Sequence, residues 1–468
     1  MPPLVVALLL LLLPSLEGST PESTGVALWL NYARPVSSTF LAAFGAISTI
    51  ACPNHTAFEP TGRACQELSD GFAGMLGRRP ALLAQVANEY RGGEGGAGPG
   101  TVTLVAAPTA PFVAMAPWPP EPEAEGWVLE GSSRAPGGIT VTSRSGAGVL
   151  YGAFRLLHLV RREAPELLVG EGEGPGEGEA AKTPPGASPM APPSIRSAPA
   201  SPLRAWNLWD NRDRSVERGY AGQSVFQYEK LPETMLPRYR DYARLLASTG
   251  VNVIVWDNVN ACGNDNQYML NASVIVAMQP LVALFYDYGV RSFVVPCYSS
   301  PIKVGGLATA DPFDKSVSEW WARTAATIQE TWEGGIAVSE AGGATGHRPF
   351  AFGGFLLKAD CEGEPGPGTY KRTELEGANA MADALAPVGA VAIWRAFAHP
   401  PRGEDQAEYQ FKLFESWNKP NATRPNVVLQ CKNGPFDFQV REPVHSLFGH
   451  LTNVNLIVEF QATQEYVH

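Results

Sequence analysis

Three ionisable side chains stand at alternate positions directly after a short apolar run in the second half of the chain. The run covers residues 352–357, and Lys358, Asp360 and Glu362 follow before glycine and proline end the segment. A short apolar run is typical of a strand buried on both faces, and the two-residue period of a strand would place the three side chains on one side. A lysine and two carboxylates at the end of a buried strand form a candidate active site. The alternative is an ordinary charged strand end.

The same design recurs along the second half of the chain. Apolar or aromatic runs that end in polar or charged residues occupy positions 204–211, 251–260, 292–300, 390–397, 426–435 and 456–466. Most gaps between them have apolar residues at helical spacing, and alternating strands and helices predict an α/β fold with a parallel sheet. Polar residues at the carboxyl ends of many strands favour a (β/α)8 TIM barrel with its site on that face. An open doubly wound sheet is the alternative, although no glycine-rich turn marks a switch point.

The length of 468 residues favours more than one domain. Residues 25–165 have the pattern of a smaller α+β domain. Residues 166–203 are rich in Gly, Glu, Pro, Ala and Ser, which predicts a low-complexity linker or insertion. The barrel is expected over residues 204–468.

The first residues resemble a secretory signal. Residues 1–19 contain a leucine-rich run that is too short to span a bilayer. The sequons at Asn54, Asn271 and Asn421 add weak support for a secreted glycoprotein. We therefore expect an extracellular protein.

Charge and cysteine usage exclude several classes of function. The net charge is -11 and no basic cluster stands out, which argues against nucleic acid and anionic membrane surfaces as partners. The six cysteines form no CxxC pair and have no zinc-like spacing to histidine, so we expect no metal and no cofactor. Cys52 and Cys65 are close enough in sequence to form a disulfide. Cys361 is disfavoured as a nucleophile because no histidine lies near it in sequence.

Six ordered motifs carry a resemblance to one family. They are Arg-Ala-Trp-Asn-Leu-Trp-Asp-Asn at 204–211, Glu-Arg-Gly-Tyr-Ala-Gly at 217–222, Lys-Ala-Asp-Cys-Glu-Gly at 358–363, Lys-Asn-Gly-Pro at 432–435, Asp-Phe-Gln-Val-Arg-Glu-Pro at 437–443 and Glu-Phe-Gln-Ala-Thr-Gln-Glu-Tyr at 459–466. Together they resemble the α-glucuronidases of glycoside hydrolase family 67. The resemblance is dense from residue 204 onward and looser before it.

The resemblance implies an activity in xylan degradation. Members of this family remove glucuronic acid, or its 4-O-methyl ether, that is α-1,2-linked to xylooligosaccharides, and they invert the anomeric centre. The substrate, and hence the expected partner, is a xylooligosaccharide that bears glucuronic acid. The residues implied are Glu362 as general acid, Asp437 and Glu465 as candidate bases that activate water, Lys358, Arg395 and Lys432 as partners of the uronate carboxylate, and Trp209 and Val259 beside the sugar.

The chemistry of these side chains agrees with the implied roles. An inverting glycosidase needs one protonated and one ionised carboxyl, about 6.5–9.5 Å apart, with water between the base and the sugar. Carboxyls on different barrel strands can span that gap, and a neighbour such as Asp360 can raise the pKa of the acid. An anionic substrate needs fixed cations, which three strand ends can supply. For each cation the alternative is a structural ion pair.

The sequence also departs from the family pattern. Cys361 stands where the family usually has a small hydroxyl residue, and Asp257 stands where we expect an uncharged one. Only seven barrel strands can be counted, and the chain ends just after Glu465. We therefore expect a C-terminally truncated chain whose barrel lacks its last strand, with a homodimer expected only for a full-length chain.

Two other functions remain open. Residues 138–161 resemble the small domain that precedes the barrel in β-hexosaminidases. Those enzymes use an adjacent Asp-Glu pair, whereas Cys361 separates Asp360 from Glu362 here. A non-catalytic carbohydrate-binding protein on a barrel scaffold is the other alternative.

Overall fold

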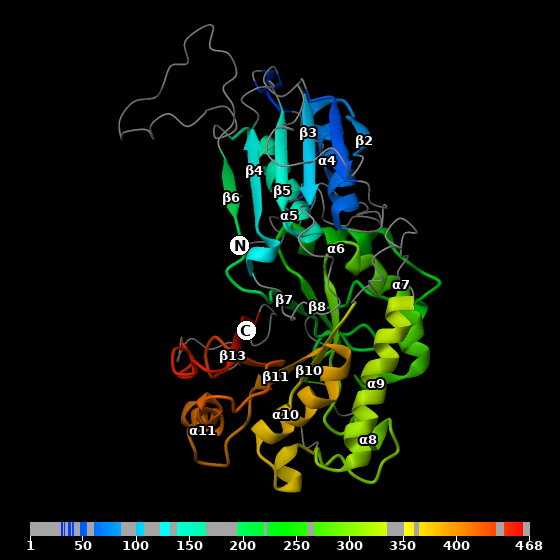
Figure 1. The fold of residues 1–468 in the computed structure, drawn as a ribbon. Coiled ribbons are helices and arrows are strands. Elements are labelled where there is room, and N and C mark those ends of the chain that lie inside the picture. The colour runs from blue at the N-terminus through cyan, green and yellow to red at the C-terminus, as the bar shows by residue number, and fades with distance from the viewer. Residues whose placement is uncertain are drawn as a thin grey trace, which may run out of the picture.

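The strands of the computed structural model belong to two separate sheets (Figure 1). The structure describes residues 30, 32, 36–38, 40–41, 47–53, 60–85, 100–106, 122–131, 138–164, 194–219, 222–260, 266–334, 351–359, 365–436 and 444–461. No helix among these residues is long and apolar enough to cross a membrane.

The first sheet has six strands. In spatial order they are β2 (Ala81–Gln85), β1 (Thr49–Pro53), β3 (Thr101–Ala106), β5 (Ile139–Ser143), β4 (Trp127–Gly131) and β6 (Ile195–Ser197). The first four are parallel, whereas β4 runs antiparallel to both of its neighbours. Helices α4 (Pro60–Leu76) and α5 (Gly146–Arg161) pack against each other and against this sheet. The predicted disulfide between Cys52 and Cys65 is confirmed, and it joins β1 to α4.

β6 lies inside the range 166–203, for which the sequence predicts a linker. Its three residues pair with β4 and complete the first sheet, so that sheet extends past residue 165. Pairing with β4 and the packing of half-buried Ile195 against the core account for this strand, whose other two residues are exposed. Residues 165–193 and the expected signal at 1–19 lie outside the described part of the chain.

The second sheet is curled and has seven parallel strands in sequence order. The strands are β7 (Ala205–Asn207), β8 (Val253–Trp256), β9 (Arg291–Val294), β10 (Phe352–Leu357), β11 (Val391–Ala396), β12 (Val427–Lys432) and β13 (Asn455–Glu459). The intervening helices are α6 (Pro237–Ser248), α7 (Ala272–Tyr286), α8 (Ser300–Lys303), α9 (Lys315–Gly334), α10 (Glu374–Leu385) and α11 (Gln406–Phe414). Short 3-10 helices are η1 (Pro122–Glu125), η3 (Tyr228–Lys230), η4 (Asn266–Leu270), η6 (Pro367–Tyr370), η7 (Ala386–Val388) and η8 (Glu415–Asn418). The parallel α/β arrangement and the seven strands predicted for it are confirmed.

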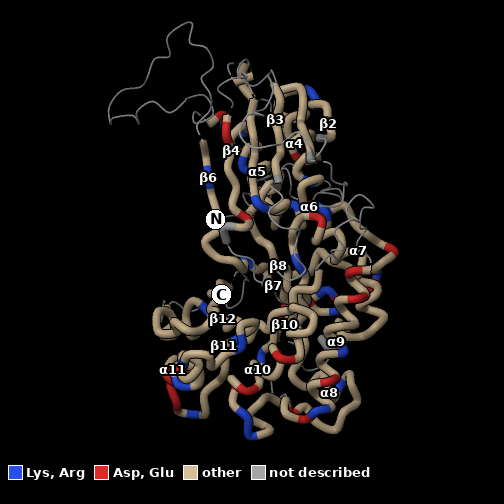
Figure 2. Tube along the Cα trace, in the orientation of Figure 1, with Lys and Arg blue, Asp and Glu red and all other residues tan. Residues whose placement is uncertain are grey.

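The charged residues of the second sheet and its surroundings are spread over the helices and the loops between them. Figure 2 shows acidic and basic residues interspersed there rather than sorted by sign. Lys412 pairs with Glu408 at 2.6 Å on α11, and Arg424 pairs with Asp383 at 2.7 Å. All four side chains are about half exposed or more, so each pair contributes little to stability.

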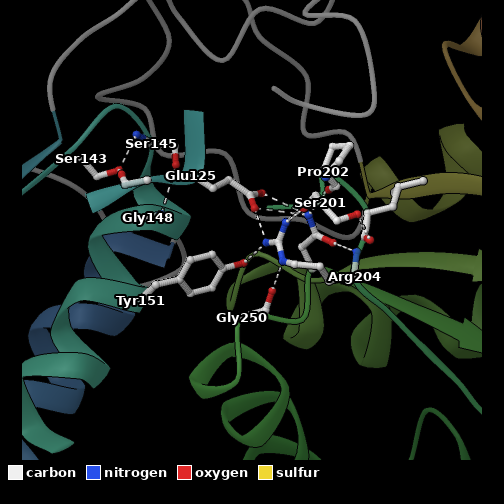
Figure 3. A network of polar contacts seen from close by, with 12 residues as sticks. Glu125, Ser143, Ser145, Gly148, Tyr151, Ser201, Pro202, Arg204 and Gly250 are labelled. Atoms are coloured by element: carbon white, nitrogen blue, oxygen red, sulfur yellow. Dashed lines mark hydrogen bonds and ion pairs between the residues drawn. The ribbon is translucent and has the colours of Figure 1, made fainter. Parts of the chain in front are cut away.

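Buried ion pairs join the two parts of the chain. The guanidinium of Arg204, just before β7, donates to Glu125 and to the hydroxyl of Tyr151, as Figure 3 shows. Arg244 of α6 binds Glu67 of α4 at 2.5 Å. Because these side chains are largely shielded from water, removing one partner would leave a charge that is costly to bury. The pairs therefore fix the first sheet against the start of the second.

One glycine is required by the close approach of two central strands. Gly354 has φ +143°, and a Cβ atom there would lie 1.9 Å from the carbonyl oxygen of Val391. The register of β10 against β9 shifts between Phe352 and Gly354. A larger residue would force β10 away from β11. Arg395 lies on β11 and Lys358 directly follows β10, so both candidate site residues depend on this spacing.

Candidate functional site

The two-residue period of the strands decides which side chains reach the inner face of the second sheet. One apolar cluster lies on the inner face of the second sheet, and Val391 and Ile393 of β11 belong to it. Ala392 and Trp394 lie on the other face, in the cluster that includes the helices. Arg395 therefore continues the inner row. Lys358 stands two positions after Leu356, which also belongs to the inner cluster, so Lys358 faces inward as well. Lys432 follows Val428 and Gln430, and Glu459 follows Ile457. All four polar residues lie at the carboxyl ends of parallel strands, so they meet at one edge of the sheet.

The three predicted cations converge on one aromatic ring. Lys432 Nζ lies 3.3 Å from the centroid of the Phe397 ring, Lys358 Nζ lies 5.2 Å from it, and Arg395 Cζ lies 5.3 Å from it. The residues are 2%, 4% and 2% exposed, respectively. The electron-rich face of an aromatic ring attracts cations. Buried like charges at this spacing still repel each other and require anions nearby.

Glu459 supplies one of these anions. Its carboxylate accepts hydrogen bonds from Arg395 Nε at 2.7 Å and Arg395 Nη2 at 2.6 Å, and a third from Gln430 Nε2 at 2.6 Å. Burial alone would raise the pKa of the Glu459 carboxyl. The charge and hydrogen bonds of Arg395, the Gln430 amide and the charge of Lys432 outweigh burial and lower that pKa. Glu459 is therefore ionised at neutral pH and forms a bidentate pair with Arg395.

Asn260 joins two of the cations to a second carboxylate. Its Oδ1 accepts hydrogen bonds from Lys358 Nζ at 3.1 Å and Arg395 Nη1 at 3.2 Å. Its Nδ2 donates to Glu217 Oε1 at 3.3 Å and Oε2 at 3.2 Å. Glu217 is buried and has φ +54°, and its backbone N–H donates to the carbonyl of Trp209 at 2.7 Å. Glu217 Oε1 also lies 3.7 Å from Arg218 Nε, so this carboxylate faces a further cation besides the Asn260 amide.

Trp209 and Val259 form the apolar side of the site. Arg395 Cζ lies 5.6 Å from the centroid of the Trp209 ring. Val259 belongs to the same inner cluster as Trp209 and is completely buried. Asp257, the unexpected acid in this loop, has φ +86° and accepts the N–H of Asn258 at 2.8 Å. Its carboxylate thus supports the turn that leads from β8 to Asn260.

A buried histidine adjoins the strand end that carries Lys432. His445 Nε2 lies 3.0 Å from Gln410 Oε1, and its Nδ1 accepts the N–H of Leu447 at 3.2 Å. Burial first, and then the charge of Lys432, lower the pKa of His445 to about 4. Its backbone N–H donates to the carbonyl of Asn433 at 2.8 Å. A neutral imidazole therefore anchors the segment next to Lys432 without adding charge.

The predicted acid and bases lie outside the described residues. Glu362, Asp437 and Glu465, together with Asp360 and Cys361, have no described position. The structure therefore brings Trp209, Val259, Lys358, Arg395 and Lys432 to one edge of the sheet and leaves the carboxyl spacing untested. Within the described residues, no group of three His, Cys, Asp or Glu side chains could hold a metal ion.

Sequence reasoning did not assign Glu459, Asn260, Glu217 and Phe397 to the site. Glu459 opens one of the motifs and stands two positions after Ile457, so the strand period could have placed it on the inner face. Asn260 ends the polar run after β8. Glu217 opens the motif at 217–222, and Phe397 ends the run 390–397, but neither position shows which side chains it contacts.

The protein is therefore of the parallel α/β class. Its functional face lies at the carboxyl ends of the strands, where the buried cations and carboxylates gather. The model of the glycosyl hydrolase family 67 middle domain matches residues 187–468, and that of the glycosyl hydrolase family 67 N-terminus matches residues 28–156. The chain belongs to glycosyl hydrolase family 67.

Several curated proteins are similar to this chain. It is 33% identical over 473 residues to "Alpha-glucuronidase A" of Emericella nidulans, and the match covers 98% of this chain and 49% of that protein. It is 32% identical over 477 residues to "Alpha-glucuronidase" of Hypocrea jecorina, with the same two coverages. A "Probable alpha-glucuronidase A" of Neosartorya fischeri is 38% identical over 278 residues, which are 58% of this chain and 31% of that protein. The chain spans about half the length of the curated relatives it matches.

Proposed function

We propose that this chain carries the chemistry of an α-glucuronidase that acts on xylan fragments. The reaction is hydrolysis of the α-1,2 bond between glucuronic acid, or its 4-O-methyl ether, and a xylooligosaccharide, with inversion at the anomeric carbon. The observation that carries the proposal is the convergence of Lys358, Arg395 and Lys432 on Phe397. The names of the family 67 relatives support the same activity.

In the proposed complex the three cations hold the carboxylate of the sugar. The bidentate contact with Glu459 gives the Arg395 guanidinium a fixed orientation in the site. Lys358 and Lys432 add compact charges on either side. Three converging cations favour a uronate over a neutral hexose. Trp209, backed by Val259, packs against the sugar ring.

Glu362 protonates the leaving xylose oxygen, and Asp437 or Glu465 removes a proton from the attacking water. An inverting mechanism keeps the acid and base apart so that this water fits between the base and the anomeric carbon. Glu362 follows Lys358 by four residues, and Asp437 follows Lys432 by five. This short spacing in sequence keeps both carboxyls on segments that begin at the described cation site.

Two further proposals concern the setting of the site. The seven-stranded sheet is the larger part of a (β/α)8 barrel, a proposal supported by its curl and its sequential parallel order. The protein is also secreted, as the signal-like segment at 1–19 and the Cys52–Cys65 disulfide suggest, because disulfides persist in oxidising compartments.

Incubation with aldotriouronic acid tests the activity. The protein is expected to release free uronic acid whose initial anomer is β, while Glu362→Gln releases none. Binding of the oligosaccharide without turnover by the unaltered protein would instead support a carbohydrate-binding role. Release of N-acetylglucosamine from an aryl glycoside would support the hexosaminidase alternative.

A further inference from the structure

We propose that Asn260, oriented by Glu217, is a positioning residue that sets Lys358 and Arg395 for a uronate carboxylate. This inference rests on the proposed function, because it assumes that those two cations bind the carboxylate. Neither Asn260 nor Glu217 has a role among the site residues implied by the resemblance.

The first step is that one atom aligns two cations from different strands. Oδ1 of Asn260 accepts from Lys358 Nζ at 3.1 Å and from Arg395 Nη1 at 3.2 Å. Lys358 follows β10 and Arg395 lies on β11, so their backbones alone do not fix how the long side chains end. A shared acceptor holds both nitrogens close enough to meet the same carboxylate.

The second step is that Glu217 decides which way the Asn260 amide faces. A carboxylate can only accept hydrogen bonds, so the Nδ2 group faces Glu217 and the Oδ1 atom faces the cations. The opposite orientation would point an N–H donor at two other donors. The backbone supports the arrangement as well, because the N–H of Asn260 donates to Asn258 Oδ1 at 2.9 Å and Asn258 Nδ2 donates to the Glu217 carbonyl at 3.2 Å.

The third step is that Asn260 aligns the cations without neutralising them. Glu459 also orients Arg395, but its negative charge cancels that of the guanidinium. An amide oxygen supplies the same hydrogen-bond geometry with no net charge. Asn260 therefore does not neutralise the charge of Lys358. Asn260 thus contributes to the preference for a uronide over a neutral glycoside.

The test uses two probes that differ by one carboxylate, methyl α-D-glucuronide and methyl α-D-glucoside. Their affinities are measured by calorimetry, and the ratio of the two affinities is the readout. Asn260→Leu is expected to lower this ratio about tenfold, because two hydrogen bonds that orient the cations are lost. Asn260→Asp keeps the acceptor but adds a charge, and it is expected to lower the ratio by at least about tenfold.

Variants at Glu217 test the orientation step. Glu217→Ala removes the acceptor for Nδ2 and is expected to lower the ratio like Asn260→Leu. Glu217→Gln retains an acceptor oxygen, so its ratio is expected to stay within about threefold of the unaltered protein. A purely structural role would not separate the glutamine variant from the alanine variant in the ratio of the two probes.

The matched control is Asn252→Leu. Asn252 is buried, whereas Asn260 is half-buried, and Asn252 lies at the opposite end of β8, where its Nδ2 donates to the Pro202 carbonyl at 2.8 Å. Its loss is expected to lower the melting temperature but not the affinity ratio. If Asn260→Leu does not fold, the affinity ratios of Asn260→Asp and Glu217→Ala test the positioning role instead.

The possible failures can be told apart. An unaltered protein that binds the two probes equally would overturn both the proposed carboxylate site and this inference. An unaltered protein that prefers the glucuronide, combined with an unchanged ratio in the Asn260 variants, would overturn the inference alone. So would an equal fall in the ratio for Asn260→Leu and Asn252→Leu.

Discussion

Replacing Arg395 with methionine should destabilise the protein strongly at neutral pH and much less in acid. The Arg395 and Glu459 side chains are 1% and 9% exposed, and the guanidinium contacts both carboxylate oxygens at 2.6–2.7 Å. Breaking a buried pair by removing one partner leaves an uncompensated charge, which costs about 3–5 kcal/mol. Gln430 and the charge of Lys432 still support Glu459, so we expect the lower end of that range.

The pH dependence follows from the lowered pKa of Glu459. The unfolded carboxyl has the ordinary pKa of about 4.3, and the folded one lies below it. The contribution of the pair to stability is therefore complete above the unfolded pKa and is lost as the pH falls through the folded pKa. In Arg395→Met, burial instead raises the pKa of Glu459, so this variant recovers relative stability as the carboxyl takes up a proton. The difference between the two proteins should therefore begin to shrink above the ordinary pKa of about 4.3 and continue to shrink as the pH falls below it.

Urea unfolding at pH 7 and pH 3.5 measures both effects. The matched control is Arg424→Met, which breaks an ion pair of similar length to Asp383 whose side chains are 49% and 55% exposed. That change is expected to cost less than about 1 kcal/mol at either pH. The double variant Arg395→Met, Glu459→Leu should recover most of the loss at pH 7. A loss no larger than that of Arg424→Met, or a loss that does not depend on pH, would refute the reasoning.

Three other predictions concern the site. His445→Gln should remove a pH-dependent loss of stability, because the unfolded imidazole binds a proton at higher pH than the folded one, whose pKa is about 4. The contribution of His445 to stability should fall by up to about 3 kcal/mol between pH 6.5 and pH 4, and a variant with the same slope as the unaltered protein would contradict this. Arg395→Ala should weaken the hydrolysis of a uronide relative to that of a neutral glucoside, by about 2–5 kcal/mol of transition-state stabilisation. The measurement is kcat/KM for the two substrates. An unchanged ratio of the two kcat/KM values would exclude Arg395 as a partner of the uronate carboxylate. Glu362→Gln should abolish turnover of xylan fragments but impair a substrate with a good leaving group less, and unaltered rates on both substrates would rule out Glu362 as the acid.

The sequence predicts the second sheet well because its signal is local. Each strand is a short apolar run, and each helix between strands has apolar residues at helical spacing. The strand period also places Lys358, Arg395 and Lys432 on one face without knowledge of any contact. The strand β6 was missed because Ile195 is its only apolar residue, which is too short a signal to predict a strand without knowledge of the pairing with β4.

The partners of the cations could not be read from the sequence. Arg395 and Glu459 are 64 positions apart and lie on strands separated by β12, so no local pattern links them. The contact of Asn260 with Lys358 likewise depends on the path of a turn in which Asp257 has a positive φ. Such contacts depend on tertiary geometry, whereas the placement of Arg395 on the inner face depends only on the period of its own strand.

A crystal structure of the protein with bound D-glucuronic acid tests the central claim most directly. We predict that the carboxylate of the sugar lies within about 3 Å of donor nitrogens of Lys358, Arg395 and Lys432, with the ring against Trp209. A sugar bound with its carboxylate turned away from these three side chains, or bound at another face of the protein, would contradict the account.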